Sequence, residues 1–448
     1  MASVSTAMRV THGLVRWSPC SLYLASADSN TLVIRDAFSL QIIQRYSTLG
    51  AIQMLSWSED SQFVLTASLK RAVVQLWSVQ DASWNCKISE VSDFQLHATV
   101  WSLEDPTTRC SIRNPKLAAD GIKFTKNGLF LAVLERHDCK DSISIYSCES
   151  WEHTVHFSVD SYDCAEIAWS SDNATIAVRD TNLEFRLLVY SLDGTLLTKY
   201  KAYENALGLK SMAWSASGQF LALESFDNHL RVLSHVNWKP VADFDHESIA
   251  VTTSHANHAA IEYEESFVDS VLNRPQGKRV AVTQRKSALL SNSLQAASAA
   301  SQAAGGKKTR NICFVTRKPP FSVRTISSNP LSESPKIGKN QVLWSADSSY
   351  LASKCDQMPY NVWIWQTETL QLHSVVSLLE SVRSFRWDPT HTRLAITSGV
   401  NRVYMWTTEG VSWIDIPSES FQALSLQWAP SGDAFIVIDR QSCCLMTL

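Results

Sequence analysis

Hydrophobic positions along this chain recur in short alternating runs and not at helical spacing. A first run ends in an aromatic residue followed by Ser or a relative, and after a polar turn a second run reads aromatic–aliphatic–Ala. Val15–Trp17 with Tyr23–Ala25, and the run ending at Trp214 with Phe220–Ala222, are two such pairs. Alternation with a period of two predicts β-strands. A polar turn between two short strands predicts a β-hairpin.

This hairpin repeats along the whole chain. Its first runs are centred on Trp17, Trp57, Phe124, Trp169, Trp214, Trp344, Trp387 and Trp428. About ten residues further on lies a third strand that ends in an aromatic, as in Val74–Trp77 and Val362–Trp365, and a weaker fourth strand follows. Trp17 and Trp57 are 40 residues apart, and Phe124 and Trp169 are 45 apart. Four short antiparallel strands at this period predict an all-β fold, a WD-repeat β-propeller of about nine units.

The WD signature itself is weak. Ser78, Ser147, Ser191 and Ser234 replace the Asp that normally follows the third-strand aromatic, and no Gly-His opens a unit. We therefore expect the usual Asp–His–Ser–Trp hydrogen-bond network to be absent from most units. Aromatic packing between blades should supply more of the cohesion, with Trp84, Trp151 and Trp238 packing the outer strands.

The third unit is too short. Trp77 and Trp101, both third-strand aromatics, lie only 24 residues apart, so about 20 residues are missing and the inner hairpin with them. A shortened splice form and a true sequence divergence would both give this spacing.

At the other end of the repeat array, the last unit supplies three strands only. A strand at about Ser3–Val10 should complete it, because closure of the ring removes exposed sheet edges.

A long insertion follows the sixth unit. We expect residues 1–245 to form units 1–6, residues 246–335 a disordered basic insertion, and residues 336–448 units 7–9 of the same propeller. Residues 291–306 are of low complexity, and the stretch from Arg274 to Arg324 holds eleven Lys and Arg and no acidic residue. Such a segment buries too little apolar surface to offset its ordering entropy. The insertion has three interpretations: a solvated linker, a segment that contacts an acidic partner, or a site of control by phosphorylation.

Composition excludes several classes of function. The net charge is −3, and the ten cysteines include no CxxC, which together with the absence of a signal peptide indicates a soluble protein of a reducing compartment. No run approaches the roughly 18 apolar residues of a membrane span. Gly305–Thr309 lacks the first Gly of a phosphate loop, and His153/His156 and His255/His258 have no Cys nearby. We expect no enzyme activity, catalytic residue, metal or cofactor, and no membrane or nucleic-acid partner.

Several stretches go beyond a generic blade. They are His137–Asp141, Tyr190–Gly194 running on to Ala202–Glu204 and Leu207–Ser211, His235–Lys239, Ser334–Gly338 and Phe385–Pro389. Together they resemble the WRAP-type centrosomal WD-repeat family over essentially the whole chain except the insertion; the missing hairpin of the third unit departs from the family pattern. The resemblance implies a scaffold at the centrosome or spindle pole body. Its partners would be a coiled-coil microtubule-anchoring protein, a minus-end-directed kinesin and tubulin. It also implies roles in spindle organisation and cilium assembly.

The expected partner surface lies on the loops of three successive units. Loops between second and third strands are rich in charge there, and a loop around Tyr203 should lie beside them. Surface loops on a rigid body are where binding residues concentrate. The candidate residues are Arg136, Asp138, Lys140, Asp141, Arg179, Asp180, Glu184, Tyr203, Glu204 and Lys210. Ordinary solvated loops are the alternative reading of this surface. An RNA- or translation-associated propeller is the alternative function, and the basic insertion is what favours it.

Overall fold

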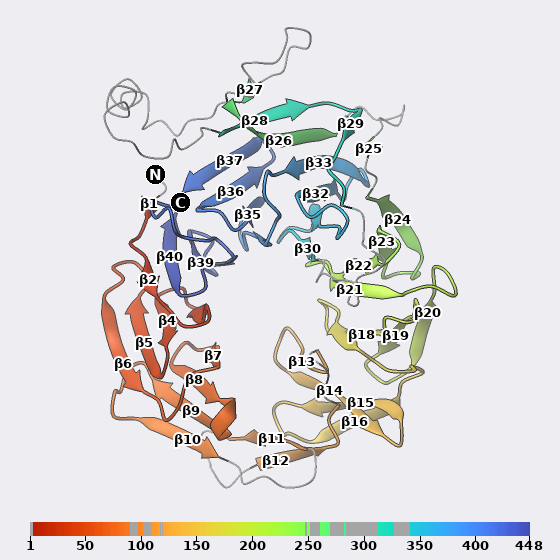
Figure 1. Cartoon of the computed structure of the whole chain (residues 1–448). Helices are drawn as coiled ribbons and strands as arrows, with labels where there is room; N and C mark the ends of the chain where they lie inside the picture. The colour runs from red at the N-terminus through yellow and green to blue at the C-terminus, as the bar shows by residue number, and fades with distance from the viewer. Residues whose placement is uncertain are drawn as a thin grey trace.

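The chain folds into a ring of small β-sheets (Figure 1). The structure, a computed structural model, describes residues 3–89, 97–102, 109–116, 118, 120–246, 249–250, 260–268, 282–283, 312–326 and 341–448. Apart from the 3-10 turn η1 (Leu69–Arg71), the named elements of this described part are strands. The expected all-β propeller is confirmed. The low-complexity stretch 291–306 lies outside the described residues.

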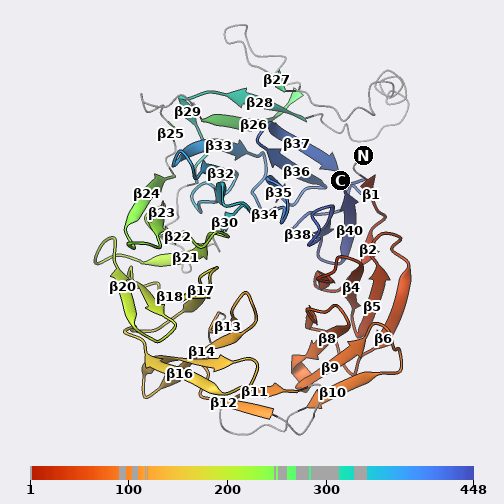
Figure 2. The same ribbon diagram turned by 180° about the vertical axis from the view of Figure 1, so that it is seen from behind.

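Seven units have four antiparallel strands that follow chain order; six of them are separate four-stranded sheets, and the strands of unit 7 belong to a seven-stranded sheet. The first three of these are β3 (Val15–Trp17), β4 (Tyr23–Asp28), β5 (Thr31–Asp36) and β6 (Ile42–Ser47) in unit 1; β7 (Met54–Trp57), β8 (Phe63–Ser68), β9 (Val73–Ser78) and β10 (Asn85–Ser89) in unit 2; and β13 (Ile122–Phe124), β14 (Phe130–His137), β15 (Lys140–Ser147) and β16 (His153–Ser158) in unit 4. The other four are β17 (Glu166–Trp169), β18 (Thr175–Arg179), β19 (Leu187–Ser191) and β20 (Leu196–Tyr200) in unit 5; β21 (Leu209–Trp214), β22 (Phe220–Ser225), β23 (His229–Ser234) and β24 (Pro240–Asp245) in unit 6; β30 (Val342–Trp344), β31 (Tyr350–Ser353), β32 (Asn361–Gln366) and β33 (Gln371–Ser377) in unit 7; and β34 (Ser384–Trp387), β35 (Arg393–Thr397), β36 (Arg402–Thr407) and β37 (Gly410–Asp415) in unit 8. Seen from both sides, the first strand of each unit lies toward the centre of the ring and the fourth at its rim (Figures 1 and 2).

The third unit is short, as its spacing predicts. Within the described residues it consists of β11 (His97–Trp101) paired with β12 (Arg109–Arg113). The two strands lie between units 2 and 4, with β11 on the inner side of β12 (Figure 1). They correspond to the third and fourth strands of a complete unit, so the inner hairpin is the part that is missing.

The N-terminus closes the ring. The last unit consists of β38 (Ser425–Trp428), β39 (Ala434–Ile438) and β40 (Ser442–Thr447). Two short strands, β1 (Ser3–Val4) and β2 (Met8–Arg9), pair antiparallel with β40. The expectation of a closing strand at Ser3–Val10 is confirmed, and Val10 is 1% exposed in the core that unit 1 shares with the last unit.

The insertion is more ordered than the sequence suggests. Strand β26 (Ile261–Phe267) pairs in parallel with β33 at the rim of unit 7, and β28 (Ile312–Arg317) and the short β27 (Val282–Thr283) continue that sheet outward. Two further short strands, β25 (Ile249–Ala250) and β29 (Phe321–Ser322), pair with each other. Phe314 and Val315 are at most 1% exposed. The expectation of one disordered stretch over 246–335 is therefore corrected for β26 and β28, whose apolar positions pack against units 7 and 8.

Tryptophan indoles link the inner strands of neighbouring units. In each case the indole N–H donates to a backbone carbonyl of the preceding unit's first strand, at 2.9–3.4 Å. The donors are Trp17, Trp57, Trp169, Trp214, Trp344, Trp387 and Trp428, and the acceptors are Gln427, Arg16, Lys123, Ala168, Ala213, Leu343 and Arg386 respectively. Every acceptor residue directly precedes the Trp or Phe that centres its own first strand. The repeated aromatic thus joins one blade to the next, and at Trp17, Trp387 and Trp428 the indole belongs to a buried residue whose donor must be satisfied.

Part of the usual WD hydrogen-bond network survives in unit 7. The indole of Trp365 donates to Ser353 Oγ at 2.9 Å, and Ser353 Oγ lies 2.8 Å from His246 Nε2. His246 Nδ1 lies 2.7 Å from the carbonyl oxygen of Asn228. Nδ1 therefore carries the proton that it donates to this carbonyl, and Nε2 accepts from the serine hydroxyl. Burial lowers the pKa of His246 to about 4.

Candidate protein-binding face

Loops of units 4, 5 and 6 meet on one face of the ring. Because strand directions alternate, the loops between second and third strands emerge on the same face as the connections between units. Three of these segments, residues 159–165, 180–186 and 201–208, hold one another, and we call them the loop face. Asp180 accepts hydrogen bonds from the backbone N–H groups of Tyr162 at 3.0 Å and Asp163 at 2.9 Å. Gly208 lies so close to Glu184 that a Cβ at this position would sit 1.9 Å from the Glu184 carbonyl oxygen.

Asp141 anchors the first of these segments. Its carboxylate is 2% exposed and accepts from Lys116 Nζ at 3.0 and 3.1 Å, from Ser161 Oγ at 3.0 Å and from the N–H of Cys164 at 2.6 Å. Lys116 also lies 2.7 Å from Asp163, and this hydrogen bond lowers the pKa of Asp163. Arg136 forms an ion pair with the same Asp163. A buried carboxylate that accepts four hydrogen bonds is fully satisfied, so Asp141 positions the segment from below.

Asp180 plays the corresponding part in unit 5. It is 1% exposed, and Arg186 lies 3.7 Å from its carboxylate. The guanidinium of Arg186 lies 4.2 Å from the ring centroid of Tyr162, a cation–π contact. Glu184 lies 3.8 Å from Arg186, and its side chain is 38% exposed. Asp180 is therefore a support for this loop, and Glu184 is the group that reaches solvent.

Arg179 and Lys210 join neighbouring units. Arg179 donates to Glu166 Oε2 at 2.9 Å and to the carbonyl oxygen of Leu209 in the next unit at 3.3 Å. Burial raises the pKa of Glu166, the partner carboxyl. Lys210 donates to Asp356 of unit 7 at 3.2 Å, and its side chain is 7% exposed. These two cations are engaged between blades and are not presented to a partner.

Tyr203 lies at the edge of the loop face and is also largely engaged. Its hydroxyl donates to the carbonyl oxygen of Leu207 at 2.6 Å, and its ring packs at 4.9 Å from Phe185. Burial raises the pKa of Tyr203. Glu204 beside it is exposed and lies 3.5 Å from Lys201. The aromatic expected to anchor a partner thus mainly holds its own loop.

The structure divides the predicted site residues into two groups. Asp141 and Asp180 are buried, and Arg179 and Lys210, of intermediate exposure, are bound between blades; Asp138, Lys140 and Glu204 are exposed, whereas Arg136, Glu184 and Tyr203 are intermediate. Sequence reasoning missed the apolar side chains that the loop face presents to solvent: Leu183 at 73%, Tyr162 at 60% and Leu207 at 46% exposure. A large apolar residue inside an otherwise polar loop was the available signal. Apolar side chains rimmed by charges are typical of a protein–protein contact. The assignment of the predicted residues to partner binding stays a prediction.

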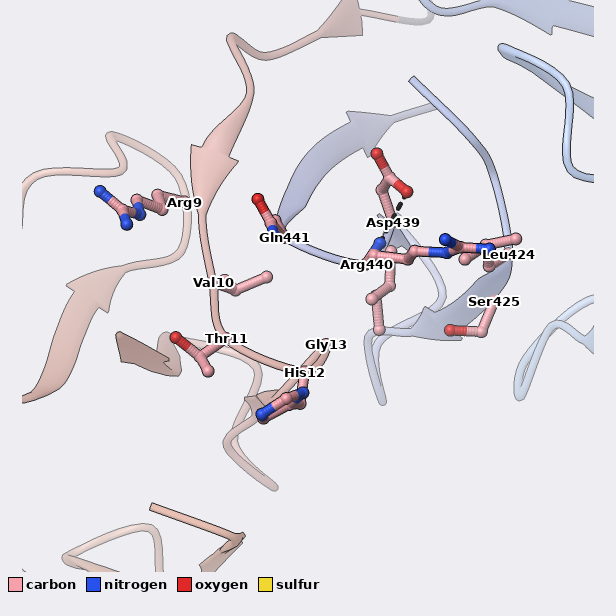
Figure 3. Close-up of a pocket in the computed structure, with 11 residues that line it drawn as sticks. Arg9, Val10, Thr11, His12, Gly13, Leu424, Ser425, Asp439, Arg440 and Gln441 are labelled. Carbon is pink, nitrogen blue, oxygen red and sulfur yellow. Dashed lines mark hydrogen bonds between the residues drawn. The ribbon is translucent and has the colours of Figure 1, made fainter. Parts of the chain in front are cut away.

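A pocket lies at the seam where the ring closes. It has a volume of about 700 Å³ and is lined by the turn around His12 and by residues 438–441 and 424–425 (Figure 3). Arg9 points away from Asp439 and Arg440, and the Asp439 carboxylate accepts from the Arg440 N–H at 2.6 Å (Figure 3). The residues that line the pocket include His12, which has an imidazole side chain, and Asp439, which has a carboxylate. The pocket is the space left where the closing strand meets the last sheet.

Among the described residues there is no group of three or more His, Cys, Asp or Glu side chains that could hold a metal ion. Within the same part of the chain, no helix is long and apolar enough to cross a membrane.

Comparison with known proteins places this ring in a family. Models of known protein families give no match to the chain. The mouse (Mus musculus) WD repeat-containing protein WRAP73 is 37% identical over 455 residues, which cover 97% of this chain and 93% of the relative. The chain belongs to the WRAP-type WD-repeat family.

More distant likenesses agree with the WD-repeat propeller fold. An uncharacterized WD repeat-containing protein of Schizosaccharomyces pombe is 20% identical over 360 residues, covering 75% of this chain and 63% of that protein. The crystal structure of the C-terminal WD40 domain of Sif2 superposes with a TM-score of 0.52 at 12% identity, covering 99% of this chain and 98% of that one. This WRAP-type chain is accordingly a WD-repeat scaffold with the WD40 propeller fold.

Proposed function

We propose that this protein is a non-enzymatic scaffold of the centrosome or spindle pole body. It binds a coiled-coil microtubule-anchoring protein, and through it, together with a minus-end-directed kinesin and tubulin, anchors microtubule minus ends, organises the spindle and supports cilium assembly. Membership of the WRAP-type family supports the scaffold role. The cellular place and the partners are our proposal.

The observation that carries the binding role is the loop face. Tyr162, Leu183 and Leu207 are exposed on loops that buried Asp141 and Asp180 hold in place. A preformed surface binds without the ordering cost that a flexible segment has to overcome. Exposed apolar side chains give an anchor, and the exposed charges at Asp138, Lys140 and Glu204, with the half-buried Glu184 beside them, give a polar rim. A coiled coil presents a matching combination, with apolar residues along a seam and charges beside it.

The test is capture of the coiled-coil partner by variants of the loop face. Tyr203→Ala or Arg179→Glu would disturb contacts with Phe185 and Leu209 inside the protein, so these residues are poor probes of the surface. Leu183→Asp combined with Leu207→Asp changes side chains that are 73% and 46% exposed. We expect this pair to weaken capture at physiological salt at least tenfold, with an unchanged circular-dichroism melt.

Val236→Asp is the matched control, because Val236 is 78% exposed on unit 6, outside the loop face. It should capture the partner as the parent does, and it should reach the microtubule-organising centre in cells. Undiminished capture by the loop-face variant would contradict the proposal. So would RNA binding that falls steeply with salt and is lost in the same variant, because that would identify the alternative, RNA-associated propeller.

A further inference from the structure

The chain of indole links around the ring is broken at one place. Every complete unit except unit 4 begins with a tryptophan that donates to the unit before it. Unit 4 begins with Phe124, whose side chain has no N–H to donate, and the inner hairpin of unit 3 that would accept is missing from the described residues. The indole donor is thus missing from unit 4 at the same junction where the accepting strand is missing from unit 3. We call the place of the two missing strands the vacant inner position of unit 3.

Solvent-exposed apolar side chains of the described residues face this position. Ile122 is 46% exposed and Phe124 is 58% exposed. In the other units the residue equivalent to Ile122 is at most 7% exposed; these equivalents are Val15, Leu55, Ile167, Met212, Val342, Phe385 and Leu426. Across the vacant inner position, Met54 on the first strand of unit 2 is 54% exposed. The repeat itself shows what covers such a strand elsewhere in the ring, which is the first strand of the preceding unit.

A strand edge also faces the vacant inner position. β11 pairs with β12 along its outer side, from His97 opposite Arg113 to Trp101 opposite Arg109. Among the described residues no strand pairs with its inner side, where each complete unit has its second strand. An edge of this kind presents backbone N–H and C=O groups that another extended chain can pair with. Apolar walls and a strand edge together specify an extended, two-stranded occupant and not a helix.

We propose that the vacant inner position of unit 3 binds a β-hairpin of another polypeptide, which completes the blade by strand addition. One strand pairs with β11, and the other packs against Ile122 and Phe124. Because side chains alternate between the faces of a strand, the guest must be apolar on both faces, one toward unit 2 and one toward unit 4. The inner hairpins described in this chain all belong to their own sheets, so a second copy has none to give and the occupant is a different protein.

The test uses a fluorescein-labelled peptide of residues 52–68, the inner hairpin of unit 2, as the probe. We expect a saturable rise in fluorescence anisotropy with the full-length protein. Ile122→Asp and Phe124→Asp change exposed side chains, so the fold should persist while binding weakens at least tenfold. Phe38→Asp, at a residue that is 72% exposed on unit 1, is the matched control and should bind as the parent does.

A second arm fills the vacant inner position within the chain. Replacing residues 90–96 by residues 52–72 supplies an inner hairpin and its following turn directly before His97. This graft should raise the melting temperature by several degrees and abolish peptide binding, whereas a Gly-Ser segment of equal length should do neither. Absence of peptide binding, or binding that survives both the graft and Phe124→Asp, would overturn the proposal. A dimer of the parent chain that the graft abolishes would also overturn it, because the occupant would then be a second copy.

Discussion

His246 is a buried residue whose protonation the fold opposes. Its ring is 3% exposed, is held between Asn228 and Ser353, and stacks edge-on against Trp363 and Trp365. Nε2 accepts a hydrogen bond from the Ser353 hydroxyl. Protonation of Nε2 would break this hydrogen bond, which orients Ser353 toward Trp365. At the residue scale, the seventh blade therefore depends on a neutral imidazole.

We predict that acidification destabilises the protein through this residue. The folded state keeps His246 neutral down to about pH 4, whereas in the unfolded chain its pKa returns to the ordinary value of 6.5. Between these values the unfolded state binds more protons, so the free energy of unfolding falls by up to about 1.4 kcal/mol per pH unit as pH decreases. Urea unfolding between pH 7 and pH 4 measures this.

The control for the pH prediction is an exposed histidine. His246→Gln should flatten the pH dependence while lowering stability at pH 7, and His137→Gln, whose parent side chain is 72% exposed, should leave the slope unchanged. Equal slopes in the parent and His246→Gln would contradict the assignment.

The indole links make a second prediction at the residue scale. Trp387→Phe removes a donor that bonds the carbonyl oxygen of Leu343 at 2.9 Å in a site only 8% exposed. The loss should cost about 1–3 kcal/mol, because the carbonyl loses its partner and the smaller ring leaves space. The reverse change, Phe124→Trp, supplies an indole where no inner strand of unit 3 is described, so it should leave the melting temperature unchanged. If Trp387→Phe and Phe124→Trp changed the stability to a similar extent, the indole links would contribute nothing to it.

At the scale of elements, β26 and β28 tie the insertion to two blades. β26 lies beside β33 of unit 7, and Glu265 reaches unit 8 by accepting from the Tyr404 hydroxyl at 2.9 Å. Its other carboxylate oxygen accepts the Leu379 N–H at 3.0 Å. Glu265 is 4% exposed, and burial raises the pKa of Tyr404. A buried carboxylate held by two units makes these strands part of the propeller.

Two deletions separate the ordered strands from the residues between them. Replacing residues 284–311 with a short Gly-Ser linker should leave the melting temperature within about 2 °C, because β27 already pairs with β28 and loop length changes closure entropy slowly. Deleting residues 261–317 should lower it by several degrees, because Phe314 leaves its contacts with Tyr404 and Trp413. Thermal melts of both variants decide the matter. If the larger deletion were as harmless as the smaller one, the insertion would be dispensable throughout.

The elements differ in how far the sequence determines them. A period of 40–45 residues and a repeated Trp predict where the blades lie, because the same strand pattern recurs many times and its copies can be compared. The strands β26 and β28 escape notice because each occurs once, on either side of the low-complexity stretch, and pairs with a partner distant in the chain. The loop face is similar: charges at Asp141 and Asp180 are visible in the sequence, but only the fold shows that both are buried and that Leu183 is exposed.

At the scale of the whole molecule, the ring depends on its ends. Ser3 pairs with Thr447 and Met8 with Cys443, and the indole of Trp17 donates to Gln427 across the same seam. Deleting residues 1–10 should lower the melting temperature by several degrees, because it uncovers the edge of β40 and removes Val10 from the core. Deleting ten residues from 291–306 is the control and should have little effect. Equal effects of the two deletions in a thermal melt would argue against closure by these strands.

The pairing of β1 with β40 also sets an order of events during synthesis. The first strand leaves the ribosome hundreds of residues before its partner exists, and at typical elongation rates of about 5–20 residues per second that wait lasts roughly 20–90 s. The earlier blades can form meanwhile, but the N-terminal segment cannot take its place until the final strand is made. A chain that stops early, through a nonsense codon or a stalled ribosome, therefore retains an unpaired N-terminal segment and an open sheet edge. Such features are what cellular quality control recognises in unfinished proteins.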